Sequence, residues 1–158
     1  MKTAKTTRAA ATSPDPARPQ ADATWLLLFG SWLIATASSL GALYFSEVMD
    51  MPPCVLCWYQ RIAMFPLVLL LPAGLFPLDR RVVRYTLPLA LAGCGVALFH
   101  VLLVAGVIPE EIRPCNQGVP CADSPVIGFG FVTIPLLSLV AFGAIAVLLV
   151  LAHSRSSK

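Results

Sequence analysis

Four long apolar runs, separated by short polar segments, dominate the pattern of hydrophobic and polar positions. A helix needs about 20 residues to cross the hydrocarbon of a membrane. The second run begins at Ile62 and is short, but it reaches this length if residues 57–61 form its outer turn. The pattern therefore predicts an all-α membrane protein with transmembrane helices over about 25–44, 57–78, 85–108 and 129–152.

Composition supports the membrane interpretation. Hydrophobic residues make up 58% of the 158-residue chain and charged residues only 12%, and the mean hydropathy is +0.80. A soluble domain of this size needs more polar surface than that. We therefore expect residues 25–152 to form a four-helix transmembrane bundle. Residues 1–24 are rich in Ala, Thr, Pro and charge and are expected to be a disordered cytoplasmic tail, followed at the other end by a short cytoplasmic tail over 153–158.

The basic residues are unevenly distributed and predict the orientation. Positively charged segments stay in the cytoplasm, so both termini and the turn at 79–84 are predicted to be cytoplasmic. The cysteine-bearing loops then face the outer, oxidising compartment, where disulfides form. The net charge of +3 is thus a topology signal rather than a nucleic-acid signal. Nine of the eleven Lys and Arg residues lie on the cytoplasmic side: Lys2, Lys5, Arg8, Arg18, Arg80, Arg81, Arg84, Arg155 and Lys158.

The first apolar run allows one alternative. A basic tail, an apolar stretch and then Ala-Thr-Ala at 35–37 are similar to a secretory signal with a cleavage site. The run continues past that point to Tyr44, which favours an uncleaved first helix. Both interpretations leave the cysteines outside.

The most informative motif is residues 54–61, which read Cys-Val-Leu-Cys-Trp-Tyr-Gln-Arg. Cys54 and Cys57 share a helix face near a helix N-terminus, where the helix dipole lowers the pKa of a thiol. Arg61 lies one turn beyond Cys57 and adds a cation, which favours the thiolate. The motif indicates a redox-active pair at the membrane boundary, within reach of a lipid-soluble oxidant. The competing interpretation is a structural disulfide beside an arginine that extends to the interface, although so small a loop constrains the chain little.

A second pair, Cys115 and Cys121, lies in the outer loop predicted over about 109–128. Alone, this pair would favour a structural bridge. Two dithiol pairs that face one compartment can instead pass two electrons by thiol–disulfide exchange. A four-thiolate zinc site is a further alternative, but the spacing of the second pair is looser than usual and the compartment is oxidising. We therefore predict no metal site.

Two residues of the third run complete the candidates. His100 lies about two turns from the outer end of this run. It is either a histidine hydrogen-bonded to a neighbouring helix or a donor to a carbonyl of a bound redox cofactor near Arg61. Cys94 is expected to be an inert core thiol.

Taken together, the four predicted helices, the motif at 54–61 and the later cysteine pair resemble the DsbB family of membrane disulfide oxidases. The resemblance covers residues from about 25 to 152. Residues 54–66 and 114–139, the latter with Gly-Phe-Val-Thr-Ile-Pro at 130–135, are similar to the short-loop branch called BdbC. In longer members the loop cysteines are further apart and joined by an amphipathic segment. Here five residues intervene, which leaves the order of exchange between the two pairs open.

The resemblance implies a protein-disulfide oxidoreductase that supports disulfide bond formation. A soluble thioredoxin-fold thiol oxidase, DsbA-like, would be reoxidised at the outer face. Cys115 would form the mixed disulfide with this partner, and Cys121 would then exchange with Cys54. Cys57 would face a membrane quinone, ubiquinone or menaquinone, which receives the electrons.

The resemblance also implies roles for two other residues and a location. Arg61 would stabilise the thiolate and the reduced quinone, and His100 would match a quinone-binding histidine. The protein would be a multi-pass protein of a bacterial inner membrane, with its redox cysteines on the periplasmic or outer side. The rival hypothesis is a non-enzymatic membrane protein with two structural disulfides that binds a partner.

Overall fold

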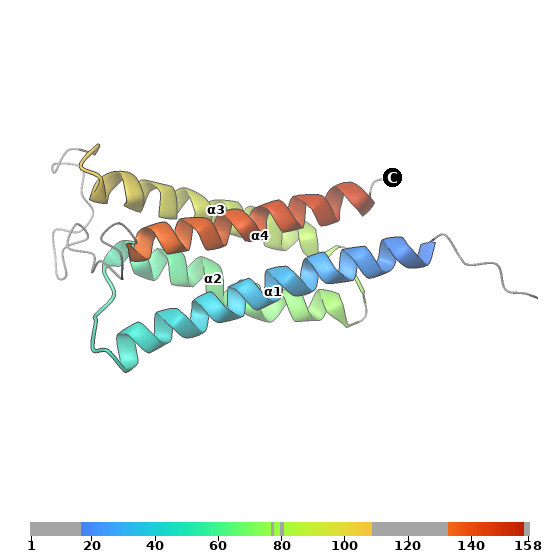
Figure 1. The fold of residues 1–158 in the computed structure, drawn as a ribbon, viewed down its shortest axis with the longest axis horizontal. Coiled ribbons are helices and arrows are strands. Elements are labelled where there is room, and N and C mark those ends of the chain that lie inside the picture. Colours follow the sequence, from blue (N-terminus) through green and yellow to red (C-terminus); the bar gives the residue numbers. More distant parts are fainter. Residues whose placement is uncertain (1–16, 77, 80, 109–132, 157–158) are drawn as a thin grey trace, which may run out of the picture.

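A computed structural model of the chain describes residues 17–76, 78–79, 81–108 and 133–156. The described residues form four α-helices and no β-strand (Figure 1). All four are long and apolar enough to cross a membrane. The prediction of a four-helix transmembrane bundle is therefore confirmed. The helices are α1 (Ala17–Glu47), α2 (Val55–Leu75), α3 (Val82–Val104) and α4 (Ile134–Ser156).

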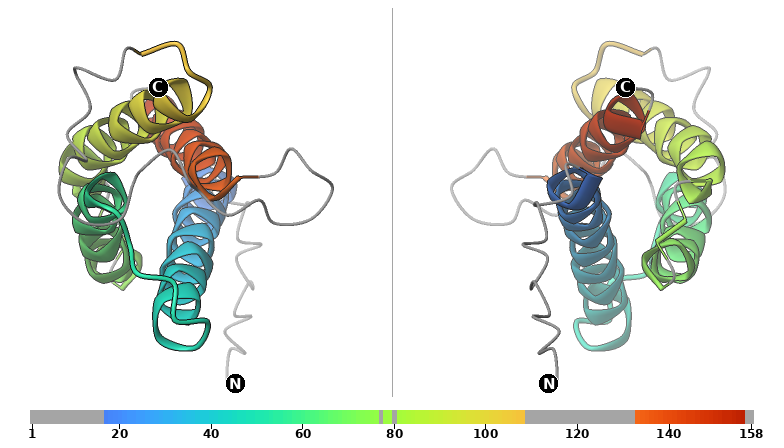
Figure 2. Two further views of the ribbon diagram at one scale, coloured as in Figure 1. Left: turned by 90° about the vertical axis from the view of Figure 1, so that its left-hand side faces the viewer. Right: turned by 90° about the vertical axis from the view of Figure 1, so that its right-hand side faces the viewer.

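The four helices are arranged as a ring, seen end-on in Figure 2. Helix α1 contacts α2 and α4, and α3 contacts the same two neighbours on the opposite side of the ring. The start of α1 and the end of α4 lie at one end of the bundle, while α2 starts at the other (Figure 1). The cysteine motif at the start of α2 and the end of α4 therefore lie at opposite ends of the bundle.

All four helices begin at other residues than the apolar pattern predicts, and α2, at Val55 instead of 57, differs least. Helix α1 starts at Ala17 instead of 25, because the intervening residues are mostly good helix formers and Pro19 lies in the first turn, where no backbone N–H is required. Helix α4 starts at Ile134 instead of 129. The Thr133 carbonyl accepts the first hydrogen bond of this helix, from the Leu137 N–H at 3.1 Å. Helix α3 starts at Val82, three residues before its predicted start.

Two helices end earlier than predicted, each for a local reason. Helix α2 ends at Leu75 instead of 78, because Phe76 precedes a proline and is extended (φ −136°, ψ 96°). Helix α3 ends at Val104 instead of 108, because Gly106 takes a left-handed conformation (φ 73°). Gly106 N–H then donates to the Leu103 carbonyl and Val107 N–H to the Leu102 carbonyl, which is a Schellman motif.

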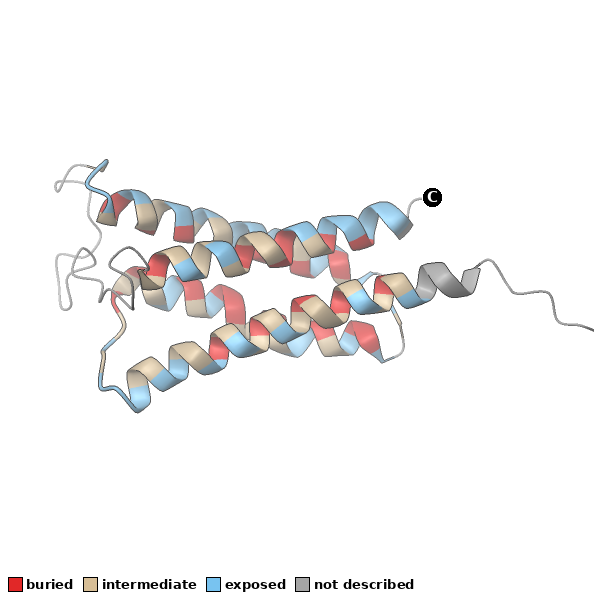
Figure 3. Cartoon of the chain, viewed as in Figure 1, coloured by how far each residue is buried: buried red, intermediate tan, exposed pale blue. Residues whose placement is uncertain are grey.

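The exposed surface of the bundle carries large hydrophobic side chains, and the buried positions include many small ones. Leu69, Tyr85 and Val140 are each more than 60% exposed, and exposed positions recur along the helices in Figure 3. In water such an apolar surface would make the protein associate with other molecules, whereas the hydrocarbon chains of lipid solvate it. Ala35, Ala90 and Ala97 are fully buried, which allows close contact between helices.

The tightest such contact joins α3 to α4 through Gly93 and Phe142. A methyl group added at Gly93 would overlap the Phe142 ring, which is itself fully buried. Gly95, two residues along the same helix, is exposed and has open space around it. The two glycines therefore differ in packing while sharing a helix.

We expect Gly93→Ala to lower the free energy of unfolding of the detergent-purified protein by about 1–3 kcal/mol, the usual cost of overpacking a core. Thermal unfolding measures the change. Gly95→Ala is the matched control and should be neutral or slightly stabilising, because alanine favours the helix. Equal unfolding temperatures for the two variants would contradict this account of the α3–α4 contact.

Candidate active site

The cysteine motif is held at the start of α2 by the residues that end the preceding loop. Pro52 and Pro53 precede the helix, and Cys54 is its N-cap. The Cys54 sulfur accepts a hydrogen bond from the Cys57 N–H at 3.4 Å, and the Cys54 carbonyl accepts one from the Trp58 N–H at 3.1 Å. The first bond satisfies the Cys57 N–H, which has no partner within the helix, and the second is the first regular backbone hydrogen bond of α2. The sulfur is therefore part of the structure that starts α2.

The two sulfur atoms of the motif lie side by side. Cys54 Sγ and Cys57 Sγ are 3.1 Å apart, and the two sulfurs are not joined by a disulfide. A disulfide needs about 2.05 Å, so a movement of about 1 Å would close the bond. Cys54 is buried and Cys57 is half-buried. The pair can therefore interconvert between dithiol and disulfide without rearrangement of the helix.

A buried histidine on α3 lies next to the first cysteine. His100 Nε2 is 3.9 Å from Cys54 Sγ, and its Nδ1 is 3.3 Å from the Gln60 side-chain nitrogen. His100 is fully buried and Gln60 is 5% exposed. Gln60 therefore fixes the ring so that Nε2 points at the sulfur. The tautomer of the ring depends on which way the Gln60 amide faces.

These contacts favour the Cys54 thiolate. Hydrogen bonding from the Cys57 thiol is the largest cause and His100 adds a smaller one, so that the pKa of Cys54 is lowered from 9.0 to about 4 even though burial acts in the opposite direction. Arg61 is not among the groups that shift the pKa of Cys54, and its predicted effect on the thiols stays a prediction. Cys54 is thus the sulfur of the pair that these contacts favour as the thiolate.

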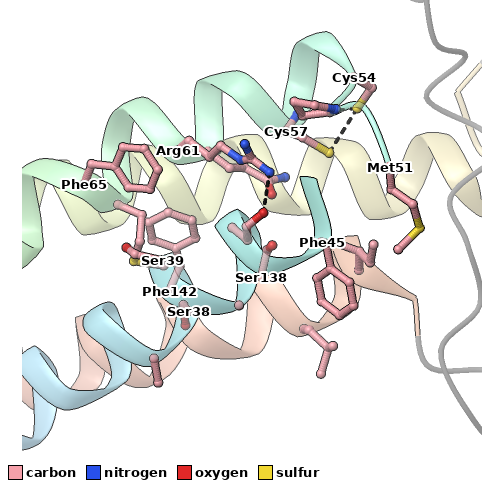
Figure 4. Close-up of a pocket in the computed structure, with 18 of the residues that line it drawn as sticks. Ser38, Ser39, Phe45, Met51, Cys54, Cys57, Arg61, Phe65, Ser138 and Phe142 are labelled. Carbon is pink, nitrogen blue, oxygen red and sulfur yellow. Dashed lines mark hydrogen bonds between the residues drawn. The ribbon is translucent and has the colours of Figure 1, made fainter. Parts of the chain in front are cut away.

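Arg61 extends from α2 toward α1. Its Nη2 donates a 2.6 Å hydrogen bond to the Ala42 carbonyl, and its guanidinium carbon lies 5.5 Å from the centre of the Trp58 ring. That distance is typical of a cation–π contact. Both interactions hold the charged group at one side of a hollow beside Cys57, as Figure 4 shows.

The hollow is a cavity of about 410 Å³. This volume lies within the roughly 300–1,000 Å³ that is typical of small-molecule sites. Its walls come from α1, the loop before α2, α2 itself and the first turns of α4, and no residue of α3 is among those that line it. Cys57 and Arg61 lie on the α2 side, with Phe65 and Phe142 further in (Figure 4).

The cavity lining suits a flat ring that carries carbonyl oxygens. Phe65 and Phe142 offer aromatic surfaces, and Arg61 offers a cation. Ser39 also lines the cavity, and its hydroxyl is buried without a hydrogen-bond partner among the described residues. Buried polar groups are normally hydrogen-bonded, so an unpaired hydroxyl at a cavity wall indicates a position for a ligand's acceptor.

The structure brings together four of the six predicted site residues. Cys54, Cys57 and Arg61 line the cavity, whereas His100 contacts Cys54 from behind and is not among the cavity-lining residues. The expected contact of His100 with a cofactor stays a prediction, while its contact with the Cys54 sulfur is described. Cys115 and Cys121 lie outside the described residues.

Two residues of the site were missed from the sequence. Gln60 is a buried polar residue in an apolar helix, which is a recognisable signal because polar side chains are costly at membrane depth. Ser39 resembles the other small residues of its run, and only the packing of α1 shows that it faces the cavity. Trp58 and Tyr59 are both exposed, as expected of interfacial aromatics.

Comparisons with known proteins agree on one family. The family model described as disulfide bond formation protein DsbB matches residues 21–152. A probable disulfide formation protein of Metapseudomonas resinovorans is 45% identical over 135 residues, which cover 85% of this chain and 94% of the relative. Disulfide bond formation protein C of Bacillus subtilis (strain 168) is 43% identical over 133 residues, covering 84% and 96%. No solved structure gave a significant match.

The low pKa of Cys54 predicts an unusual titration of the reduced protein. In a variant with Cys94, Cys115 and Cys121 replaced by serine, thiolate absorbance at 240 nm should persist at pH 7 and disappear only as the pH falls through about 4. Above its pKa the sulfur is deprotonated, so lowering the pH below that value restores the proton.

Cys57→Ala in the same background removes the largest cause of the shift, so the midpoint should move up toward 9.0. His100→Leu should move it up by less. A midpoint above pH 8 before either substitution would show that the described contacts do not stabilise the thiolate.

Proposed function

The chain belongs to the DsbB family, and from that premise we propose that it is a membrane disulfide oxidase that reoxidises a DsbA-like thiol oxidase and passes the electrons to a membrane quinone. One observation carries the proposal. The Cys54 and Cys57 sulfurs lie 3.1 Å apart at the wall of a cavity that also presents Arg61. A dithiol beside a cation and a cavity for a flat acceptor is the arrangement that such a reaction needs.

The protein steps are two thiol–disulfide exchanges. A thiolate of the reduced partner attacks the Cys115–Cys121 disulfide at Cys115 and forms a mixed disulfide, and the second partner thiol then releases the oxidised partner. The reduced loop pair passes its two electrons to the Cys54–Cys57 disulfide, which becomes the dithiol. Each exchange breaks one S–S bond and forms another, so two electrons and two protons reach Cys54 and Cys57.

The cavity residues have defined tasks toward the acceptor. When bound, the quinone supplies the final oxidation by accepting the two electrons and two protons. Arg61 and the Ser39 hydroxyl would hold its oxygen atoms, and Phe65 and Phe142 would contact its ring. Cys57 is the half-buried sulfur at the cavity wall, while Cys54 is the more buried one beside His100. The two cysteines are therefore suited to different exchanges.

The distribution of charge supports an orientation with the cysteines outside. Arg81, Arg84 and Arg155 lie near the start of α3 or the end of α4, at the opposite end of the bundle from Cys54 (Figure 1). Positive charge favours the cytoplasm, so Cys54 would face the periplasm or outer space of a bacterial inner membrane. That side is oxidising and contains the soluble partners whose disulfides such an enzyme would renew.

The direct test is oxidation of a reduced DsbA-like protein by the purified protein in detergent, with a soluble quinone analogue as acceptor. Loss of quinone absorbance reports turnover. We expect Cys57→Ser and Cys115→Ser each to abolish it, and Cys94→Ser to leave it unchanged. Failure of the parent protein to reduce the quinone, with disulfides that survive mild reductant, would leave a structural role for both pairs.

Arg61 provides a second, quantitative prediction. Arg61→Met removes a charged hydrogen-bond donor from the cavity, and such bonds contribute about 1.5–3 kcal/mol, so KM for the quinone analogue should rise by about tenfold or more. Arg84→Met removes an exposed arginine outside the cavity and is the matched control. A KM unchanged by Arg61→Met, with normal thermal stability, would contradict a role for Arg61 in acceptor binding.

A further inference from the structure

We propose that the reduced active site also binds a thiophilic divalent cation such as Zn²⁺, with Cys54, Cys57 and His100 as its protein ligands. One ligand atom from each residue is available, and these three atoms all lie within 4.8 Å of one another. Two thiolate sulfurs and one imidazole nitrogen form a donor set typical of zinc. The site differs from the four-cysteine arrangement considered from the sequence, because His100 on α3 replaces the loop cysteines.

Cys54 and His100 are close to the spacing that this donor set needs, and the Cys57 sulfur must move the most, because the three ligand atoms span up to 4.8 Å. Zinc bonds of about 2.3 Å to sulfur and 2.0–2.1 Å to nitrogen place tetrahedral ligand atoms roughly 3.5–3.8 Å apart. Cys54 Sγ and His100 Nε2 are already 3.9 Å apart. The sulfurs are 3.1 Å apart and would have to separate by about 0.7 Å. Cys57 is half-buried at the cavity wall, so its side chain has space for this movement.

Gln60 supplies the support that a ligating histidine needs. A metal-bound imidazole normally directs its other ring nitrogen to a hydrogen-bond acceptor. The Gln60 amide lies 3.3 Å from His100 Nδ1, and with its oxygen turned to that nitrogen it accepts the Nδ1 proton. Nε2 then presents its lone pair toward the sulfurs. The same side chain, turned the other way, lets Nε2–H donate to the Cys54 thiolate.

The charge balance also favours binding at a buried position. The charges of two thiolates, a neutral imidazole and one divalent cation sum to zero. This avoids the free-energy cost of an isolated charge in an apolar environment. Binding displaces the thiol proton of Cys57, since Cys54 is already a thiolate, and transfers no electrons. A fourth coordination position would face the cavity beside Cys57, where water can reach the metal.

The site exists only in the reduced protein. Closing the Cys54–Cys57 disulfide removes both sulfur ligands, so the metal and the oxidised state exclude each other. The support for metal binding is the geometry alone. Its consequence, that bound metal keeps the pair reduced and stops turnover, rests on the proposed oxidase function.

The test uses full-length protein in detergent, with Cys94, Cys115 and Cys121 replaced by serine so that only the site cysteines remain. Zn²⁺ is titrated against a chromophoric chelator, and Co²⁺ is added separately for its thiolate charge-transfer absorption. We expect one metal per reduced chain and none in the disulfide form. Neither readout involves quinone or a partner protein, so a failure of metal binding leaves the oxidase proposal untouched.

Substitutions separate this site from adventitious binding. His100→Leu should weaken Zn²⁺ binding at least tenfold and change the Co²⁺ spectrum, whereas His153→Leu, which replaces the exposed second histidine of the chain, should do neither. Gln60→Leu should weaken binding by about 10–100-fold through the lost support of His100. If His100→Leu does not fold, Cys57→Ser is the alternative variant. It should abolish the charge-transfer band while its elution volume in size-exclusion chromatography stays normal. The proposal would be overturned if the reduced parent bound no stoichiometric Zn²⁺. It would also be overturned if a folded His100 or Gln60 variant bound Zn²⁺ as tightly as the parent.

Discussion

The residue at which α2 begins determines the geometry of the whole site. Because the helix starts at Val55 with the Cys54 sulfur as its cap, Cys57, Gln60 and Arg61 follow at fixed angles around the first two turns. Cys57 and Arg61 then reach the cavity while Gln60 meets His100. If the sequence were shifted by one residue along α2, these side chains would rotate by about 100° around the helix axis and lose their partners. The two prolines before Cys54 help to fix this start, since neither has an N–H for a preceding helix.

The remainder of the bundle supports this turn from three directions. Helix α3 brings His100 against Cys54, α1 brings the Ala42 carbonyl to Arg61, and α4 places Phe142 at the inner end of the cavity. Phe142 is also the ring that meets Gly93 of α3. The same side chain therefore closes the α3–α4 contact and shapes the cavity, so packing deep in the bundle and the form of the site are coupled.

Features that depend on neighbouring residues could be predicted from the sequence, whereas features that depend on contacts between helices could not. Helix number and the position of Cys57 in the first turn of α2 follow from local pattern. The early end of α3 depends on the conformation of Gly106, which an apolar run does not reveal. His100 was recognised as a candidate, but whether it faces the cavity or Cys54 depends on how α3 is rotated against α2. Ser39 became recognisable only once α1 was placed.

Arg61 is held by a neutral partner, and this has an electrostatic consequence. Its hydrogen bond goes to the Ala42 carbonyl and its ring contact to Trp58, and no carboxylate among the described residues forms an ion pair with it. Its positive charge is therefore not neutralised by the surrounding helices, in an environment that screens charge poorly. A molecule in the cavity that gains negative charge on accepting electrons is stabilised more after the transfer than before it. The arginine thus favours electron gain by an acceptor that becomes negatively charged beside it.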